Sequence, residues 1–259
     1  MHEFNGKIVL ITGAGRGIGK AIALAFAAEK SQVIITGRTA AILDEVAEAI
    51  RNLGAQVLAE TCDVTQRPQL ASLREKIEKR FGTVQILVNN VGIAPAADFL
   101  EMADSLWDEV MRINLSSAYN CCKTFLAPMI AARWGRIINI ASTVARVAYP
   151  GISAYATSKH ALLGLTRSLA METARSGVTV NAVCPGYVNT ELTRENARRL
   201  AEKRGRSLDE ALAMLAASCP QRRLIEPEEV AHATLMLASD RAGGITGQGI
   251  QVDGGAVMA

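Results

Sequence analysis

Short apolar runs recur along almost the whole chain and alternate with segments of helical period. Several of these runs have no polar alternation, which is typical of parallel strands that are covered by helices on both faces. Each run has the length of a single strand and is separated from the next by a helical segment. The predicted strands are Lys7–Thr12, Gln32–Gly37, Gln56–Glu60, Gln85–Asn90, Arg136–Ala141, Val178–Cys184 and Ile250–Asp253.

The intervening segments carry apolar residues at the spacing of an amphipathic helix. The clearest of them are Gly19–Glu29, Ala41–Leu53, Gln69–Phe81, Ser105–Ala132, Tyr155–Ser176 and Pro227–Ala238. Repeated strand–helix units with right-handed crossovers predict an α/β fold, a doubly wound parallel sheet of about seven strands with helices on both faces. Because residues 1–259 contain no linker, repeat or low-complexity segment, we predict a single domain.

One long excursion interrupts the alternation. Residues 189–225 contain no strand pattern, only two helical patterns at Glu191–Lys203 and Leu208–Ala217. A long segment after the carboxyl end of a strand is usually functional, so we predict a lid over the site.

Composition narrows the class of protein. Of the 259 residues 49% are hydrophobic and 20% charged, which excludes disorder as the main state, and the net charge of +3 is too small to indicate nucleic acid or a membrane surface. No apolar run is long enough to span a bilayer, and the first residues lack a signal-peptide layout. The five cysteines have no metal-binding spacing, so we expect free thiols, no metal and a cytoplasmic location.

A glycine-rich turn directly follows the first strand. Residues 12–19 read TGAGRGIG, and a helical segment comes next. Glycines at such a turn allow close approach of backbone to a pyrophosphate, which the N-terminus of the following helix attracts. The strict GxGxxG spacing fails and the pattern is TGxxxGxG, so a glycine turn without a ligand is the alternative. The context favours a Rossmann-type dinucleotide site at Gly13, Arg16, Gly17, Ile18 and Gly19.

The end of the second strand bears on the choice of cofactor. A dinucleotide fold usually has an acid there to bind the adenosine ribose, but this chain has Arg38 and no acid before Asp44. A guanidinium can hold a 2′-phosphate with two hydrogen bonds, and Arg16 can flank the same phosphate. We therefore predict NADP(H) and keep NAD(H) as possible, since both arginines can also be solvated loop charges.

Three side chains form a candidate acid–base site. Tyr155 and Lys159 are four residues apart on a predicted helix and share one face, and Ser142 follows the fifth strand. An ammonium near the phenol favours the phenolate and lowers its pKa, while the serine hydroxyl can hold a substrate carbonyl. A simple contact on the helix face is the alternative for the Tyr155–Lys159 pair.

Taken in order, these motifs make the whole chain similar to the short-chain dehydrogenase/reductase family. The resemblance rests also on Asp63-Val64, residues 89–92 (NNVG), Asn114, residues 155–159 (YATSK) and Pro185-Gly186. It implies that Tyr155 donates the proton to the carbonyl, Ser142 polarises that carbonyl, Lys159 holds the nicotinamide ribose and Asn114 anchors a relay water. It further implies cofactor contacts at Asp63, Val64, Asn90, Gly92, Pro185, Gly186, Val188 and Thr190.

Within the family, the stretches around Tyr155 and Pro185 are similar to those of 3-ketoacyl and polyketide ketoreductases. Thr193–Arg223 carries eight basic and four acidic residues, which suits coenzyme A or an acyl carrier as an anionic handle, or simply a solvated surface. By the same resemblance, Arg133 matches a position at which carrier-protein reductases present an arginine to the acidic carrier. Arg175 lies one residue away from a second such position.

The leading hypothesis is an enzyme that reduces a ketone or acyl thioester to a secondary alcohol with NADPH. The alternatives are an NAD-dependent alcohol or 3-hydroxyacyl-CoA dehydrogenase and a non-catalytic cofactor-sensing regulator. The resemblance also implies a homotetramer that uses Ser105–Ala132, Tyr155–Ser176 and the C-terminal strand region.

Overall fold

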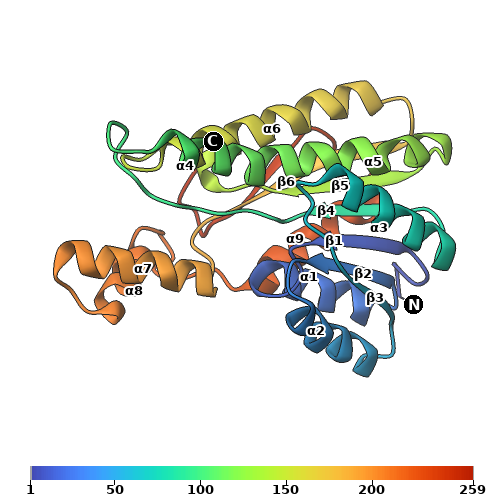
Figure 1. Ribbon diagram of the computed structural model, residues 1–259, viewed down its shortest axis with the longest axis horizontal. Coiled ribbons are helices and arrows are strands. Elements are labelled where there is room, and N and C mark those ends of the chain that lie inside the picture. Colours follow the sequence, from blue (N-terminus) through green and yellow to red (C-terminus); the bar gives the residue numbers. More distant parts are fainter. Residues whose placement is uncertain (1, 259) are drawn as a thin grey trace.

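All seven predicted strands form, and they join in one parallel sheet with the order β3-β2-β1-β4-β5-β6-β7. The structure is a computed structural model that describes residues 2–258 (Figure 1). The observed strands differ from the predicted ones by at most a residue or two at either end. They are β1 (Ile8–Thr12), β2 (Gln32–Gly37), β3 (Gln56–Thr61), β4 (Ile86–Asn89), β5 (Gly135–Ile140), β6 (Val178–Pro185) and β7 (Gly249–Val252).

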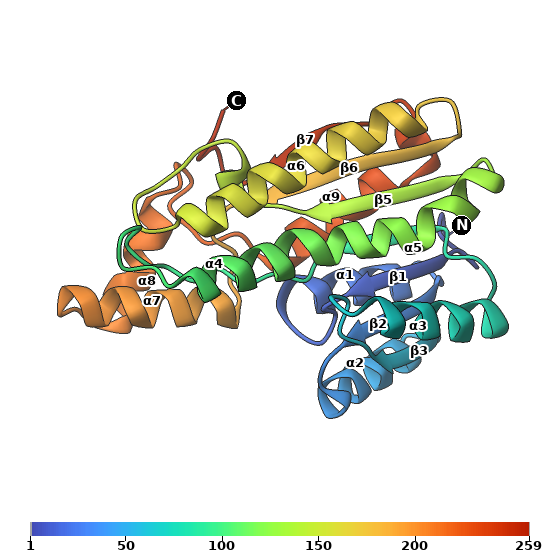
Figure 2. The same cartoon turned by 45° about the horizontal axis from the view of Figure 1, so that its top comes forward.

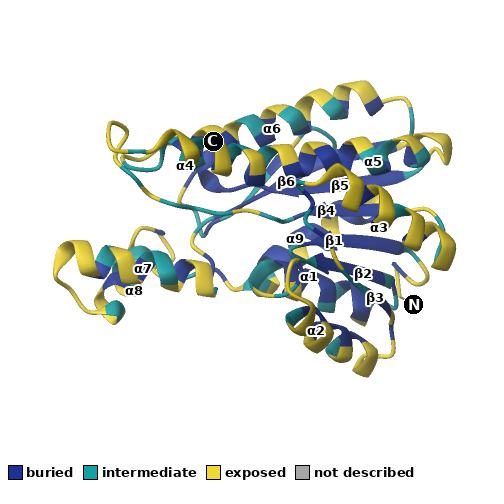
Figure 3. Cartoon of the chain, viewed as in Figure 1, coloured by how far each residue is buried: buried dark blue, intermediate teal, exposed yellow. Residues whose placement is uncertain are grey.

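Helices cover both faces of the sheet because successive strand residues point to opposite sides. In β1, Val9 and Ile11 pack on the face of α1, α2 and α9, whereas Ile8 and Leu10 pack on the face of α3, α5 and α6. These helices are α1 (Gly17–Ala28), α2 (Ala40–Asn52), α3 (Arg67–Arg80), α5 (Ser117–Ala131), α6 (Ser153–Thr173) and α9 (Pro227–Ala238). Figure 2 shows α5 and α6 side by side, and Figure 3 shows buried strands between helices with exposed outer faces. The predicted doubly wound sheet is confirmed.

The prediction of one continuous helix over Ser105–Ala132 is wrong in one respect. The segment begins as α4 (Asp104–Met111), continues as a π-helical turn, η1 (Arg112–Ser116), and then becomes α5. A π turn contains one more residue per hydrogen-bonded ring than an α turn, so it changes the direction of the side chains that follow. Such turns frequently occur at functional sites, and this one contains Asn114.

Residues 189–225 fold as a helical hairpin of α7 (Glu191–Arg204) and α8 (Leu208–Ala217), which projects from the body of the molecule (Figure 1). The two helices bury Ala197, Ala201 and Ala211 against each other. Gly205, with φ of 61°, ends α7 in the left-handed conformation.

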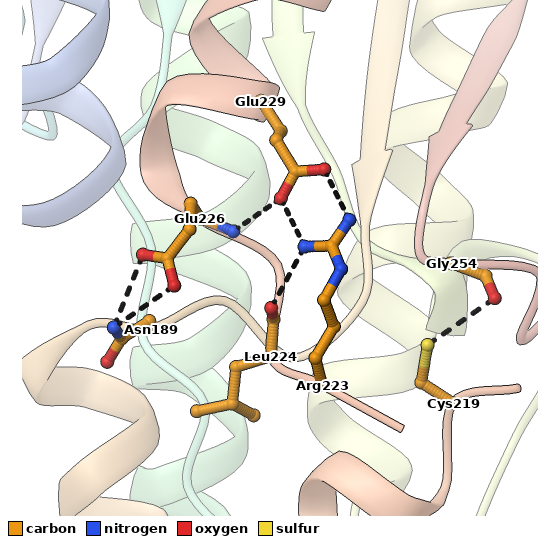
Figure 4. Close-up of polar contacts among 7 residues, drawn as sticks. All are labelled: Asn189, Cys219, Arg223, Leu224, Glu226, Glu229 and Gly254. Atoms are coloured by element: carbon orange, nitrogen blue, oxygen red, sulfur yellow. Dashed lines mark hydrogen bonds and ion pairs between the residues drawn. The ribbon is translucent and has the colours of Figure 1, made fainter. Parts of the chain in front are cut away.

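The two ends of this hairpin are fixed to each other at its base. Val188 pairs with Ile225 as a parallel bridge, and Asn189 donates its side-chain amide to the Glu226 carboxylate (Figure 4). The neighbouring Arg223 forms a two-bond ion pair with Glu229, at 2.6 and 2.7 Å. The hairpin therefore has its own small apolar cluster, and the contacts at its base hold its two ends together.

Two compositional expectations concern side chains inside this fold. All five cysteines are free and buried. Among residues 2–258, no group of His, Cys, Asp and Glu has the arrangement of a metal site, and no helix combines the length and apolarity needed to cross a bilayer.

Candidate active site

The carboxyl ends of several strands open into one cleft of about 490 Å³. It lies beside the point where β1 and β4 are neighbours and the strand order reverses, which is where open α/β sheets bind ligands. Most of the predicted cofactor residues line it, namely Gly13, Arg16, Gly17, Ile18, Arg38, Asp63, Val64, Asn90, Gly92, Tyr155, Lys159 and Thr190.

The glycine turn forms one wall of the cleft. Gly13 and Gly17 have positive φ angles of 63° and 52°, which few other residues adopt without strain. Gly19 is needed for another reason, because a Cβ there would collide with the carbonyl oxygen of Gly13. Asn90 holds the turn by donating to the carbonyls of Thr12 and Gly13, at 3.1 and 3.0 Å.

Helix α1 begins at this turn with its first N–H groups open to a ligand. Its N-cap residue, Arg16, makes no side-chain capping bond, and the first turn of the helix contains no acid. Unpaired N–H groups and the positive end of a helix dipole attract anions. This donor set fits the pyrophosphate of a dinucleotide cofactor.

One side of the cleft contains Arg16 and Arg38, and we call it the adenosine side because the predicted cofactor would place its adenosine there. This side is open and basic. Arg16 and Arg38 are both exposed and both line the cleft. A Cβ on Gly37 would meet only Leu43, at an ordinary contact distance of 3.6 Å. The end of β2 therefore leaves open space beside Arg38.

Asp63 lies on the same side, at the turn after β3. Its Oδ1 accepts hydrogen bonds from the Thr65 N–H at 2.9 Å and from the Thr65 hydroxyl at 2.8 Å. Burial by itself raises the pKa of this carboxyl, but the Thr65 bonds and the guanidinium groups of Arg112 and Arg38 bring the pKa below its usual value. Asp63 is therefore an ionised acceptor at neutral pH.

Tyr155 and Lys159 reach the cleft from α6, as their spacing predicts. The Lys159 Nζ atom donates to the carbonyl oxygen of Ile140 at 2.9 Å and lies 5.9 Å from the centre of the Tyr155 ring. Burial lowers the pKa of Lys159 to about 8.

The expectation that Lys159 lowers the pKa of Tyr155 is not met in this structure. Burial raises that pKa above its ordinary value, because a phenolate loses solvation, and only hydrogen bonding with Ser142 opposes the change. Tyr155 is therefore protonated at neutral pH, the form that an acid catalyst requires.

Ser142 and Asn114 do not line the cleft. They lie behind its wall and hold neighbouring segments by hydrogen bonds. Ser142 is 9% exposed and begins the turn after β5, where its hydroxyl accepts from the Val144 N–H at 3.3 Å. Asn114 accepts from the Ile93 N–H at 2.8 Å and donates to the Ser158 hydroxyl at 3.0 Å. The π turn thus connects the loop after β4 to helix α6, which carries Tyr155 and Lys159.

Four predicted cofactor positions, Gly19, Pro185, Gly186 and Val188, do not line the cleft wall. Gly186 donates its N–H to the Val252 carbonyl at 3.0 Å, and Pro185 ends β6. Val188 as a whole residue is 4% exposed and belongs to the core. Little of Val188 is therefore accessible to a cofactor.

Several residues of the cleft wall carry no signal in the local sequence. Thr65 and Arg112 line its adenosine side, while Glu191, Leu192 and Glu195 reach it from the first turns of α7. Arg112 stands only two positions before Asn114, but nothing in the local sequence indicates the π turn that directs it toward Thr65. The prediction of a lid at residues 189–225 pointed to the α7 residues in general terms only.

Comparisons with known proteins agree with this geometry. Residues 13–257 match the family model described as enoyl-(acyl carrier protein) reductase. The chain is 40% identical over 257 residues to the 3-oxoacyl-[acyl-carrier-protein] reductase FabG of Escherichia coli (strain K12), covering 99% of both chains. It is 37% identical over 255 residues to the D-beta-hydroxybutyrate dehydrogenase of Rhizobium meliloti (strain 1021), covering 96% of this chain and 98% of the relative.

A similar fold occurs in the crystal structure of a variant of actinorhodin polyketide ketoreductase with NADPH. It superposes with a TM-score of 0.94 at 34% identity and covers 96% of this chain and 97% of the ketoreductase. Together with the glycine turn and the Tyr155–Lys159 pair, these matches place the chain in one family. The protein is an oxidoreductase of the short-chain dehydrogenase/reductase family.

Proposed function

We propose that the protein reduces a ketone, of the 3-ketoacyl thioester type, to a secondary alcohol with NADPH. The observation that carries the proposal is that Tyr155 and Lys159 line the same cleft as the glycine turn and the two arginines, Arg16 and Arg38. The relatives named as 3-oxoacyl reductase and polyketide ketoreductase support the same reaction class.

In this proposal the cofactor, when bound, would supply the hydride that the carbonyl carbon accepts. Tyr155 donates its phenolic proton to the carbonyl oxygen, and its raised pKa keeps that proton in place until the oxygen gains charge. Ser142 polarises the carbonyl, and Lys159 binds the nicotinamide ribose. Asn114 anchors the water that returns a proton to the site and, through Ile93 and Ser158, keeps the loop and helix in register.

The cofactor preference in the proposal rests on charge. Arg38 and Arg16 would bind the 2′-phosphate, since a charge-assisted pair of hydrogen bonds discriminates strongly in favour of a phosphate. Asp63 and Val64 would contact the adenine, and Asn90, Gly92, Gly186 and Thr190 would lie along the rest of the cofactor.

The hairpin α7–α8 would act as the lid, with the substrate between it and the Tyr155 end of the cleft. Glu191, Leu192 and Glu195 already border the cleft from this hairpin. Its basic residues suit a substrate with an anionic handle, such as coenzyme A or an acyl carrier protein.

Assembly and location belong to the same proposal. Tyr119 and Ile130 on α5 and Met171 on α6 are large apolar side chains that are 41%, 41% and 81% exposed in the single chain. Their burial between copies would stabilise a homotetramer. Five free, buried thiols suit the reducing cytoplasm.

A second candidate is an NAD-dependent dehydrogenase that oxidises a hydroxyacyl compound or another alcohol. The relative named D-beta-hydroxybutyrate dehydrogenase favours it, and Arg38 would then stack on the adenine instead of binding a phosphate.

The two candidates differ in one assay. A panel of 3-ketoacyl thioesters and simple ketones is reduced with NADPH or NADH, and kcat/KM is compared. We expect at least a tenfold preference for NADPH. Equal or better use of NADH, together with alcohol oxidation by NAD⁺, would favour the second candidate.

A further inference from the structure

A chain of hydrogen bonds connects the π turn to the adenosine side of the cleft. The Arg112 Nη1 atom donates to the Thr65 hydroxyl at 3.0 Å, and that hydroxyl donates to Asp63 Oδ1 at 2.8 Å. All three residues line the cleft. We propose that Arg112 is a positioning residue for adenine recognition, which acts through Thr65 to fix the carboxylate of Asp63. This inference rests on the proposed dinucleotide cofactor.

The direction of the chain follows from the chemistry of arginine. A guanidinium can only donate hydrogen bonds, so the Thr65 oxygen must be the acceptor from Arg112. The single hydroxyl proton of Thr65 is then free to be donated to Asp63. Arg112 therefore reinforces the direction in which the hydroxyl points, and the Thr65 N–H holds the same Oδ1 atom at 2.9 Å.

This arrangement leaves the second carboxylate oxygen available. Both bonds from Thr65 end on Oδ1, and within residues 2–258 the structure places no donor on Oδ2 of Asp63. The carboxylate is ionised, because the Thr65 bonds and the charges of Arg112 and Arg38 outweigh the effect of burial on its pKa. An ionised oxygen with a fixed direction selects an N–H donor such as the exocyclic amino group of adenine.

The turn that carries Asp63 is also fixed to the helix that follows the π turn. The Asn120 side chain on α5 donates to the Thr65 carbonyl at 3.4 Å and accepts from Arg67 Nε at 3.1 Å. Arg112 at the start of the π turn and Asn120 after it thus hold the loop that carries Asp63, while Asn114 inside the π turn holds the loop after β4. The π turn that begins at Arg112 can therefore position the loops at both ends of the proposed cofactor.

The test measures cofactor binding in the absence of a ketone. Dissociation constants come from the fluorescence of the dihydronicotinamide, with three probes: NADPH, NADH and the hypoxanthine analogue of NADPH, which lacks the adenine amino group. The proteins are wild type, Arg112→Met and Thr65→Val. Thr65→Ser keeps the hydroxyl, and Arg74→Met removes a half-exposed guanidinium on α3 outside the cleft, so both serve as controls.

We expect wild type to bind NADPH about tenfold more tightly than the hypoxanthine analogue, the scale of a hydrogen bond to a charged group. Arg112→Met and Thr65→Val should reduce that ratio to about threefold or less, whereas both controls keep it. Because the ratio compares two ligands of one protein, a smaller folded fraction does not change it.

Two results would overturn the inference while the proposed function stands. The first is an unchanged ratio between the affinities for NADPH and for its hypoxanthine analogue in Arg112→Met, or equal affinities of wild type for these two probes. The second is a loss of NADPH affinity in Arg112→Met with NADH affinity unchanged, which would assign Arg112 to the 2′-phosphate. If wild type binds no dinucleotide, the proposed function and the inference both fail.

Discussion

The Tyr155 end of the cleft and the two arginines at its adenosine end are held in opposite ways. At the Tyr155 end, Lys159, Asn114 and Ser142 are 4%, 1% and 9% exposed and are held by hydrogen bonds from the protein itself. At the adenosine end, Arg16 and Arg38 are exposed side chains on turns. Burial fixes geometry and shifts pKa values, whereas exposed charges contribute attraction that depends little on exact position. The Tyr155 end should therefore determine turnover, and the two arginines should determine the choice between NADPH and NADH.

The largest effect is expected from Tyr155→Phe. This change keeps the ring and removes the proton, so kcat for ketone reduction should fall at least a hundredfold, the scale of general acid catalysis. Cofactor affinity should hardly change, because no charge at the adenosine end is altered. Steady-state kinetics and a fluorescence titration of NADPH measure the two quantities.

Tyr119→Phe is the matched control, since this tyrosine lies on the outer side of α5 and is 41% exposed. Its turnover should equal that of wild type. A Tyr155→Phe variant that keeps more than a tenth of wild-type turnover would remove Tyr155 from the chemistry.

The next largest effect is a change of cofactor preference at the adenosine end. It is expected from the double substitution Gly37→Asp and Arg38→Leu. A Cβ at position 37 would meet only Leu43, at an ordinary contact distance, so we expect an aspartate to fit there and to repel a 2′-phosphate. Preference in kcat/KM should change from NADPH to NADH by roughly ten- to a hundredfold in total. Turnover with the better cofactor should stay near that of wild type.

Gly37→Ala with Arg38 retained is the control for the added Cβ and should keep the NADPH preference. If the charged double variant lost turnover with both cofactors equally, the two ends would not be independent, and the comparison would break down.

A third effect follows from the pKa of Lys159. Burial lowers it to about 8, so the ammonium that would hold the ribose is present below that pH and is lost as pH rises through it. We expect kcat/KM for NADPH to be flat up to about pH 7 and to fall up to tenfold per pH unit above pH 8. Tyr155 adds no inflection in this range, because its pKa is raised.

Initial rates between pH 6 and 9.5 measure this profile. In Lys159→Arg the charge is retained throughout the range, so the inflection should disappear even if the rate is low. A wild-type profile that stays flat to pH 9.5 would mean that the charge of Lys159 has no part in cofactor binding.

The smallest effect is expected outside the cleft, at the base of the hairpin. Arg223→Met removes the partly exposed ion pair with Glu229, whose pKa the guanidinium lowers to about 2. Since the pair is accessible to solvent, its loss should cost about 1 kcal/mol or less in unfolding free energy, or a few degrees in Tm.

The sign of the pH dependence gives a further check on this pair. A lowered carboxyl pKa stabilises the fold above about pH 4.5, the ordinary value, and the stabilisation is lost as pH falls toward 2. Wild type and Arg223→Met should therefore differ in Tm at pH 7 and converge in acid. A large loss of turnover in Arg223→Met would show that the hairpin base contributes directly to the site.

Much of the fold could be predicted from sequence because a parallel sheet covered on both faces leaves continuous apolar runs. The motifs at residues 12–19 and 155–159 likewise predicted two parts of the cleft wall, since a turn after a strand and a helix face are local features. The π turn was missed because Arg112–Ser116 keeps ordinary helical spacing.

Burial effects were harder to predict. The pKa of Tyr155 depends on how far neighbouring segments exclude water, and the burial of Val188 depends on a bridge to Ile225, which is 37 residues away. Neither quantity is encoded in local spacing. Residues whose role depends on tertiary contacts, such as Thr65 and Arg112, were missed for the same reason.

The central claim is that hydride reaches a carbonyl carbon while Tyr155 protonates the oxygen. The most direct test supplies NADPH with deuterium at C4 of the nicotinamide, on the transferred face, to a mixture of a 3-ketoacyl and a 2-enoyl thioester. Mass spectrometry and NMR then locate the label. We predict deuterium on the carbinol carbon of the 3-hydroxyacyl product, with the enoyl thioester unchanged. Deuterium in the saturated chain formed from the enoyl thioester, with the ketone untouched, would contradict the account.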